Sequence, residues 1–364
     1  MRSVSNMPDE LIIVGPASRP TGGIARYVDE QERILSDSYQ VTVHDYSFPR
    51  GTGVVTSFPI NGIKKSIYQF LKFLFRDEPD ILHVHCGTGI SFYRSSAYII
   101  YGVIKWDCKV VLHIHGSDFD DFLENSSAIK EKYIQFVFER TDEIVTLSEK
   151  WKSLVSEYCS SDTISILPNA VDIEAYDPEI APSDTNLIFI SHLTKRKGVI
   201  ELIESIRSLD EETLRHFTIK IAGDGPLKQK IESLESSSDN IEYLGYVSEE
   251  KKTKLLNQGS VFVLPSHAEG LPFAILEAMA GGNAIISTTV GSIPEVINDE
   301  QGMLVPPASS GELKSAIENL ARSPEDIESM SRTNLEQAKK NYSWDSVKQD
   351  LISIYSKIEE GDSD

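Results

Sequence analysis

The chain has 364 residues, 40% of them hydrophobic, which is enough to build two domains with buried cores. Its formal net charge of -21 lacks the basic footprint that nucleic acid requires, so we expect no nucleic-acid partner. No stretch approaches the roughly 20 apolar residues of a membrane span.

The compartment is predicted from the cysteines and the first residues. Cys86, Cys108 and Cys159 are odd in number and far apart, which is typical of a reducing compartment. Residues 1–6 lack the apolar core of a signal peptide. We therefore expect a cytoplasmic protein.

The first apolar strand, at residues 11–14, runs into a glycine-rich loop at 15–23, and a helix follows from about Ile24. Glycines in such a loop let backbone approach a phosphate. A plain turn explains the pattern equally well.

Strands then alternate with helices along the first half of the chain. Such alternation predicts a parallel sheet covered on both faces, with ligands beyond the carboxyl ends of its strands. The expected strands are residues 40–46, 81–85, 110–115, 143–147 and 163–167, and the expected helices are 62–76, 92–104 and 150–157.

Two of these strands end in His-x-His. Alternation places His83 with His85 on one face and His113 with His115 on one face. These side chains could line a ligand crevice, form ordinary buried hydrogen bonds, or bind a metal. No complementary Asp, Glu or Cys set stands at ligand spacing, so we expect no metal, and His115 is the best functional candidate.

The helix at 62–76 has more aromatic surface than one core stripe needs, beside Lys64, Lys65, Lys72 and Arg76. A core helix with a solvated cationic face is favoured. The alternative is a patch that contacts a membrane peripherally.

The alternation of strands and helices stops near residues 169–182, and residues 177–178 and 181–184 resemble a linker. A second series of strands and helices follows, so we expect a ligand cleft between two similar halves. Its expected strands are 187–190, 217–222, 241–244, 261–264 and 284–286, and its expected helices begin near 199, 226, 249 and 273. Residues 313–340 are expected to be helical, and a further helix carries Trp344 and Tyr355.

A basic loop follows the strand at 187–190 and contains His192, Lys195, Arg196 and Lys197. Fixed cations at a strand's carboxyl end are what a diphosphate leaving group requires. The alternative is an exposed basic loop without function.

The sequence SHAEGLPFAILE at 266–277 organises the second half. Glu269 is expected in a strand-to-helix loop and Glu277 near the start of the helix that Pro272 opens. Helix amides can hold a phosphate, and a carboxylate can accept from sugar hydroxyls. On spacing alone, a buried helix with two incidental glutamates is favoured, and the flanking residues reverse this preference.

Six motifs in this order resemble the retaining GT-B glycosyltransferases of family four, the glycosyl transferases group 1. They are GGIAR at 22–26, HIHGSD at 113–118, LPNAVD at 167–172, AGDGPL at 222–227, the Glu269-x7-Glu277 segment, and GSIPEV at 291–296.

The resemblance implies an α/β fold of two Rossmann-like domains that face each other across a deep cleft. Residues 1–178 would be the acceptor domain, 179–342 the nucleotide-sugar donor domain, and 343–364 a helix that crosses back. It implies a retaining, metal-independent hexosyltransferase without a cofactor, acting in polysaccharide or cell-surface glycan biosynthesis. The donor would be a nucleotide-diphosphate sugar and the acceptor a glycan or a lipid-linked glycan. Together with the cysteines and the basic helix at 62–76, this predicts a cytoplasmic enzyme, with peripheral contact on the inner face of the cell membrane as the alternative.

The resemblance also implies site roles. The catalytic residues would be His115, Glu269 and Lys197. The residues that bind the donor would be Gly23, His192, Arg196, Gly225, Gly270, Leu271, Pro272, Phe273 and Glu277.

One position departs from the family pattern. The family usually has Gly-Arg-Leu before the lysine, whereas this chain has Ser191, His192 and Leu193. Histidine is only partly charged near neutral pH and lacks arginine's planar fork. A non-catalytic nucleotide-sugar-binding subunit is therefore one alternative, and a metal-dependent hydrolase using the paired His-x-His strands is another.

Overall fold

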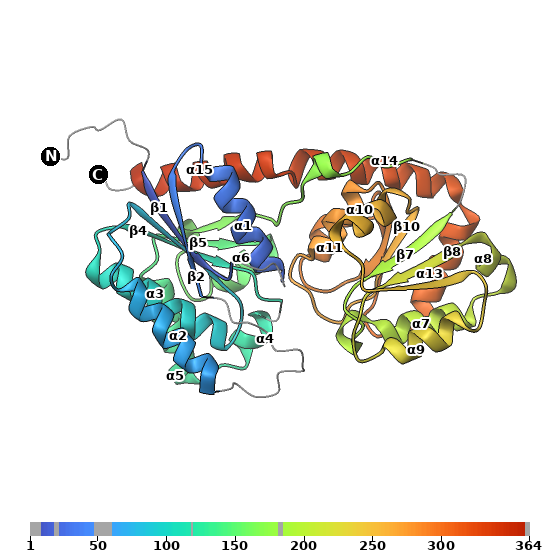
Figure 1. Ribbon diagram of the computed structural model, residues 1–364, viewed down its shortest axis with the longest axis horizontal. Helices are drawn as coiled ribbons and strands as arrows, with labels where there is room; N and C mark the ends of the chain where they lie inside the picture. Colours follow the sequence, from blue (N-terminus) through green and yellow to red (C-terminus); the bar gives the residue numbers. More distant parts are fainter. Residues whose placement is uncertain (1–8, 18–21, 47–59, 118, 181–184, 361–364) are drawn as a thin grey trace. The chain divides into compact units, whose positions relative to one another are not determined.

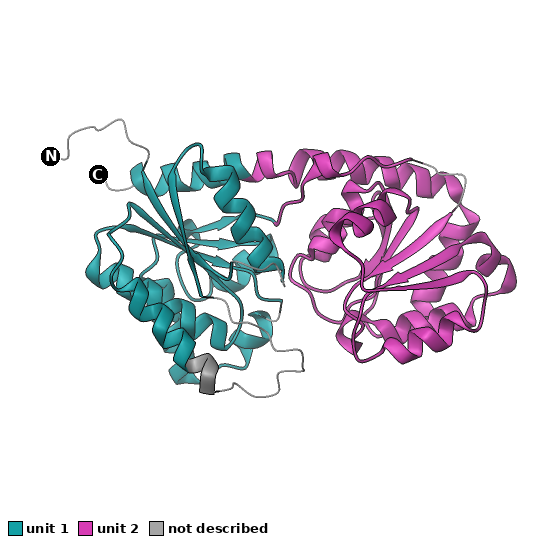
Figure 2. Cartoon of the chain, viewed as in Figure 1, with its two compact units in different colours: residues 1–168, 348–364 teal, residues 169–347 magenta. Residues whose placement is uncertain are grey.

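The structure is a computed structural model that describes residues 9–17, 22–46, 60–117, 119–180 and 185–360. The chain forms two compact units, one made of residues 1–168 with 348–364 and the other of residues 169–347 (Figure 2). The expected linker residues 181–184 lie outside the described residues.

The first unit contains a six-stranded parallel sheet in the order β2-β1-β3-β4-β5-β6 (Figure 1). Its central strands β3 and β4 are apolar and almost wholly buried, which is typical of a parallel sheet covered on both faces. The strands are β1 (Glu10–Gly15), β2 (Gln40–Asp45), β3 (Ile81–Cys86), β4 (Lys109–Ile114), β5 (Glu143–Thr146) and β6 (Ile164–Ile166).

The expected helices of this unit are present, with two that the sequence did not indicate, α4 and α5. The helices are α1 (Gly23–Leu35), α2 (Ile60–Phe73), α3 (Ile90–Lys105), α4 (Phe119–Glu124), α5 (Ala128–Phe138) and α6 (Glu149–Val155), with a 3-10 turn, η1 (Ser161–Thr163).

The second unit contains a parallel sheet in the order β12-β11-β10-β7-β8-β9. Its strands are β7 (Asn186–Ile190), β8 (Thr218–Ala222), β9 (Ile241–Gly245), β10 (Val261–Leu264), β11 (Ala284–Thr288) and β12 (Gly302–Val305), of which β12 was not expected. The first strand, β7, lies beside the fourth, β10, so the strand order reverses there. Ligands of doubly wound sheets bind at such a reversal.

The helices of the second unit pack on both faces of this sheet (Figure 1). They are α7 (Val199–Ser208), α8 (Glu211–His216), α9 (Lys228–Glu235), α10 (Glu249–Asn257), α11 (Phe273–Ala280), α12 (Ile293–Val296), α13 (Ser310–Arg322) and α14 (Pro324–Asn341), with 3-10 turns η2 (Ile173–Ala175) and η3 (Lys195–Lys197).

The expectation that residues 313–340 are helical is confirmed. The stretch is two helices, because Pro324 cannot continue α13 and instead occupies the first turn of α14.

The last helix, α15 (Trp344–Glu360), begins in the second unit and belongs to the first unit from Lys348 onward. There Tyr355 is fully buried, and Lys357 donates to both oxygens of the buried Glu143 at 2.9 Å. None of the described helices is long and apolar enough to cross a membrane.

These observations confirm the expected α/β class with two Rossmann-like domains. Each unit has its own apolar core around its sheet. The assignment of acceptor and donor roles to the two units stays a prediction.

Candidate functional site

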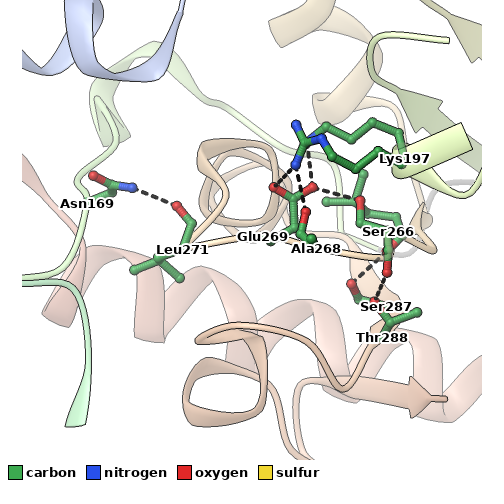
Figure 3. Close-up of polar contacts among 10 residues, drawn as sticks. Asn169, Lys197, Ser266, Ala268, Glu269, Leu271, Ser287 and Thr288 are labelled. Atoms are coloured by element: carbon green, nitrogen blue, oxygen red, sulfur yellow. Dashed lines mark hydrogen bonds and ion pairs between the residues drawn. The ribbon is translucent and has the colours of Figure 1, made fainter. Parts of the chain in front are cut away.

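The loop between β10 and α11 holds Glu269 as a buried carboxylate, 5% exposed. Lys197 Nζ donates to Glu269 Oε1 at 2.5 Å, and Ser266 Oγ donates to the same oxygen at 2.7 Å (Figure 3). Arg196 Nη1 lies 4.0 Å from Oε2 and donates to the Ala268 carbonyl at 2.7 Å. A buried charge is tolerated when it is paired and hydrogen-bonded, and this one is both.

The cations arrive from η3, which follows β7, so they lie beside Glu269 at the reversal of strand order. The backbone after η3 lies close to the start of the Glu269 loop. A Cβ at Gly198 would lie 1.8 Å from the Pro265 carbonyl oxygen, and its φ of +70° favours glycine. Gly291, with a φ of +57°, likewise leaves room for the Glu269 carbonyl.

The rest of the loop is held by hydrogen bonds from β11 and its following turn. Thr288 Oγ1 donates to the Ser266 carbonyl at 2.6 Å, and Ser292 N donates to the Gly270 carbonyl at 3.0 Å. Asn169 Nδ2 donates to the Leu271 carbonyl at 2.6 Å (Figure 3). The loop is therefore fixed before any ligand binds, which lowers the entropy cost of binding.

Pro272 does not open the helix as expected. It has an extended backbone and precedes Phe273, the first residue of α11. The first turn of α11 contains no acidic residue, so no carboxylate of that turn neutralises the positive end of the helix dipole. This end suits an anion.

Glu277 lies in α11, 3% exposed, and accepts from Lys252 Nζ at 2.8 Å. Lys252 stands on α10 and also contacts Glu249 at 2.7 Å. Lys252 was not predicted as a site residue, because nothing in the spacing between residues 252 and 277 indicates the contact. Glu277 is thus a buried acceptor that is already neutralised by a lysine.

His192 follows β7 and is exposed. Its Nδ1 donates to the backbone carbonyl of Asp224, next to Gly225. A Cβ at Gly225 would lie 2.8 Å from His192 Nδ1, so glycine is needed for this contact. The structure therefore places His192 and Gly225 together, whereas Arg196 and Lys197 are held by the Glu269 loop.

Two expected site residues lie in the first unit. Gly23 is the exposed first residue of α1, and residues 18–21 of the preceding loop lie outside the described residues. His115 directly follows β4, where its ring stacks on His113 with centroids 4.0 Å apart. The predicted sharing of a face by His113 and His115 is confirmed.

The buried histidines offer ligand atoms within 4.8 Å of one another, which raises the metal alternative. The three residues are His83, His85 and His113. However, His83 and His85 stack with an interplanar angle of 22°. The lone pairs of stacked imidazoles lie in nearly parallel planes and do not converge on one ion. The ring nitrogens instead bond one another and their neighbours, which favours a hydrogen-bonded network.

Two family models match the chain. The model described as Glycosyltransferase Family 4 matches residues 21–175, and the model described as Glycosyl transferases group 1 matches residues 184–323. Together they leave only residues 176–183 between them.

Curated relatives are similar over most of the chain. An uncharacterized glycosyltransferase, MJ1178 of Methanocaldococcus jannaschii, is 29% identical over 68% of this chain and 68% of its own length. The putative colanic acid biosynthesis glycosyltransferase WcaL of Escherichia coli is 27% identical over 62% of this chain and 61% of its own. The putative teichuronic acid biosynthesis glycosyltransferase TuaC of Bacillus subtilis is 27% identical over 66% of this chain and 60% of its own. The chain thus spans less than two thirds of the last two relatives.

Solved structures share the fold. Sucrose-phosphate synthase from Thermosynechococcus elongatus superposes with a TM-score of 0.76 at 16% identity, covering 96% of this chain and 99% of that one. HepE from Anabaena, solved with UDP and glucose, gives a TM-score of 0.68 at 14% identity, covering 96% of this chain and 100% of that one.

Proposed function

Because the chain belongs to the group 1 glycosyltransferases, we propose that it transfers a sugar from a nucleotide-diphosphate sugar to a glycan or lipid-linked acceptor with retention of configuration. The observation that carries the proposal is the buried Glu269 paired with Lys197 at the strand-order reversal of the second unit. Relatives named for colanic and teichuronic acid biosynthesis support a polysaccharide acceptor.

On donor binding, Lys197 and Arg196 are proposed to exchange Glu269 for the diphosphate as their ionic partner. Both cations stand within reach of one carboxylate, and a diphosphate carries more charge than that carboxylate. The N-terminus of α11, at Phe273, carries a partial positive charge that also attracts the diphosphate. The backbone from Gly270 to Pro272 leads into this N-terminus. Glu269, once released, accepts from hydroxyls of the donor sugar.

The proposed reaction is a same-face displacement. The bond between the anomeric carbon and the diphosphate oxygen breaks, and the acceptor hydroxyl forms a bond to that carbon on the same face. The departing phosphate oxygen takes the proton of the acceptor hydroxyl, so atoms and charge balance. Lys197, Arg196 and His192 stabilise the charge that develops on the diphosphate, and fixed charges of this kind usually contribute most to catalysis.

The ribose of the donor is assigned to Glu277. A buried carboxylate accepts from two neighbouring hydroxyls of a diol, and Lys252 pairs with this carboxylate. Gly225 and Gly23 are proposed to approach the nucleotide and the diphosphate, and His115 the donor sugar. These roles rest on the family resemblance.

Nucleotide binding tests the proposal first. Thermal unfolding is measured with UDP, GDP, ADP and dTDP, alone and as sugar conjugates, for the native chain and for Glu277→Gln. One nucleotide series should raise Tm by mass action, and the variant should lose most of that rise. The matched control is Glu242→Gln, which removes an exposed carboxylate on β9. No stabilisation by any nucleotide, or equal stabilisation of Glu277→Gln, would contradict the proposal.

Product analysis tests the finer points. NMR of the product formed from an α-linked donor should show an α-linkage, and turnover should persist in EDTA. An inverted product would refute retention. Turnover that EDTA abolishes and Mg²⁺ restores would refute metal independence.

A peripheral membrane contact is proposed for α2 and the residues that follow it. The exposed face of this segment carries Ile67, Tyr68, Leu71 and Phe75, which are 55%, 56%, 49% and 89% exposed. Cations flank this apolar stripe on a chain of net charge -21, namely Lys64, Lys72 and Arg76. Apolar side chains with flanking cations suit the surface of an anionic bilayer.

Sedimentation with vesicles tests this contact. Binding should be stronger to phosphatidylcholine vesicles containing phosphatidylglycerol than to phosphatidylcholine alone. The double variant Lys64→Glu/Lys72→Glu should lose this preference, whereas Lys339→Glu/Lys340→Glu, which changes two exposed lysines on α14, should keep it. If both double variants bind equally, the contact lies elsewhere.

A further inference from the structure

A chain of hydrogen bonds leads from His115 into the core of the first unit. His115 Nε2 lies 2.9 Å from His85 Nδ1, and His85 Nε2 lies 2.6 Å from Gln31 Oε1. Gln31 stands on α1 and is fully buried, as is His85. Gln31 therefore touches the proposed site residue only through another side chain.

The amide of Gln31 also contacts the other end of the cluster. Its Nε2 donates to Tyr355 Oη at 3.0 Å and lies 3.3 Å from His83 Nδ1. Tyr355 Oη lies 2.7 Å from His83 Nδ1. Because the amide nitrogen can only donate, Tyr355 Oη accepts from Gln31.

The orientation of this amide follows from the distances. A contact of 2.6 Å to a ring nitrogen suits an oxygen acceptor, whereas the longer contacts of 3.0 and 3.3 Å suit the amide nitrogen. The carbonyl oxygen of Gln31 therefore faces His85, and the NH₂ group faces Tyr355 and His83.

Burial keeps the inner histidines neutral. Desolvation lowers the pKa of His83 to about 3 and holds the pKa of His85 well below its usual value. A neutral imidazole carries one N–H and one lone pair. Each contact along the chain therefore decides the direction of the next.

The proton positions then follow in order. Gln31 Oε1 can only accept, so His85 is protonated at Nε2 and has its lone pair at Nδ1. The bond between His85 Nδ1 and His115 Nε2 must then be donated by His115. In its neutral form, His115 consequently has its lone pair at Nδ1.

We propose that Gln31 is a positioning residue that fixes the tautomer and ring orientation of His115 through His85. His115 then presents Nδ1 as a hydrogen-bond acceptor for a hydroxyl of the donor sugar. Tyr355, from α15, holds the Gln31 amide in the orientation that this requires. The last step rests on the proposed role of His115, whereas the tautomer does not.

Histidine-selective ¹⁵N labelling of the full chain measures the tautomers directly, without substrate. The native protein should show His115 and His85 protonated at Nε2, with assignments taken from His115→Ala and His85→Gln. A native His115 protonated only at Nδ1 would overturn the proposal, whatever the protein's activity.

Gln31→Met removes the fixed acceptor while nearly keeping the side-chain volume. His115 should then populate both tautomers, and kcat should fall roughly 10- to 100-fold, as is typical when the partner that orients a functional histidine is lost. The KM for the donor should change less than kcat, since the contacts of the diphosphate are untouched. Gln229→Met, at an exposed position on α9, should leave both the spectrum and kcat unchanged.

A milder second variant tests the same network in case Gln31→Met does not fold. Tyr355→Phe removes one of the two contacts of the Gln31 NH₂ group but leaves Gln31, His83 and His85 in place, so the His115 tautomer should shift less, and kcat should fall less, than in Gln31→Met. An unchanged tautomer with Gln31→Met would overturn the proposal. If native His115 is protonated at Nε2 as expected but His115→Ala turns over normally, the proposed role of His115 is refuted.

Discussion

Both units bury polar groups near the carboxyl ends of their strands, but they differ in how the buried groups are stabilised. In the first unit, four histidines, a glutamine and a tyrosine form a hydrogen-bonded network, and burial lowers the pKa of its three buried histidines, His83, His85 and His113. In the second unit, the buried carboxylates of Glu269 and Glu277 form ion pairs with Lys197 and Lys252. A buried histidine can shed its charge by losing a proton, whereas a buried carboxylate beside a lysine keeps its charge through pairing.

The comparison shows where each unit is vulnerable. A neutral network fails when protons are added, and a charged pair fails when one partner is removed. The predictions below separate these two behaviours.

The largest expected effect is acid unfolding of the first unit. His83, His85 and His113 have folded pKa values well below the usual 6.5. Their stabilisation is complete above pH 6.5 and falls as the pH drops, because only the unfolded chain binds protons there. At pH 5 each buried histidine lowers the free energy of unfolding by about 2 kcal/mol, so the three together lower it by up to about 6 kcal/mol.

Hydrogen exchange followed by mass spectrometry checks this prediction. Between pH 7.5 and pH 5, after correction for intrinsic exchange rates, peptides from β3 and β4 should lose protection before peptides from β10 and β11. Equal protection of both units at pH 5 would show that the histidine network is not the weak point.

Next in size is Lys197→Met. This change leaves Glu269 buried with Ser266 and the more distant Arg196, so stability should fall by about 3 kcal/mol, the lower end for a broken buried pair. Turnover should fall by about 100-fold or more, since a cation on the leaving diphosphate is lost. Urea unfolding and steady-state kinetics measure the two effects, with the exposed Lys195→Met as the control. A loss of stability without a loss of turnover would restrict Lys197 to a structural role.

Lys252→Met should have a smaller effect. Glu277 would lose its partner, so stability should fall by about 1–3 kcal/mol and nucleotide affinity by roughly tenfold. The double variant Lys252→Met/Glu277→Gln should recover much of the stability but not the affinity. A double-mutant cycle with no coupling energy would mean that the pair does not stabilise the unit.

The smallest expected effect is that of His192→Arg. An exposed charge interaction is worth about 0.2–1 kcal/mol, so diphosphate affinity should rise by no more than about fivefold. Isothermal titration with the nucleotide that stabilises the native chain measures this. Lys195→Arg, which keeps the charge in the same loop, should bind as the native chain does. If His192→Arg binds no better, His192 does not contact the diphosphate.

Local patterns were sufficient for most of the fold. Apolar runs identified the strands of both sheets, apart from the four-residue β12, and the helix starts at Val199 and Glu249 were predicted at those residues. Alternation also placed His113 and His115 on one face, because side chains of a strand repeat every two residues. The break at Pro324 was readable too, since proline rarely continues a helix.

The contacts that define the candidate site required the tertiary structure. Lys252 contacts Glu277, and Gln31 contacts Tyr355, because separate helices pack beside each other in the folded chain. No short-range sequence pattern predicts these contacts. The sequence by itself determined which residue types stand at the ends of the strands. Tertiary packing decided which of them are neutral and which are charged, because desolvation and the arrival of a partner set the protonation of a buried group.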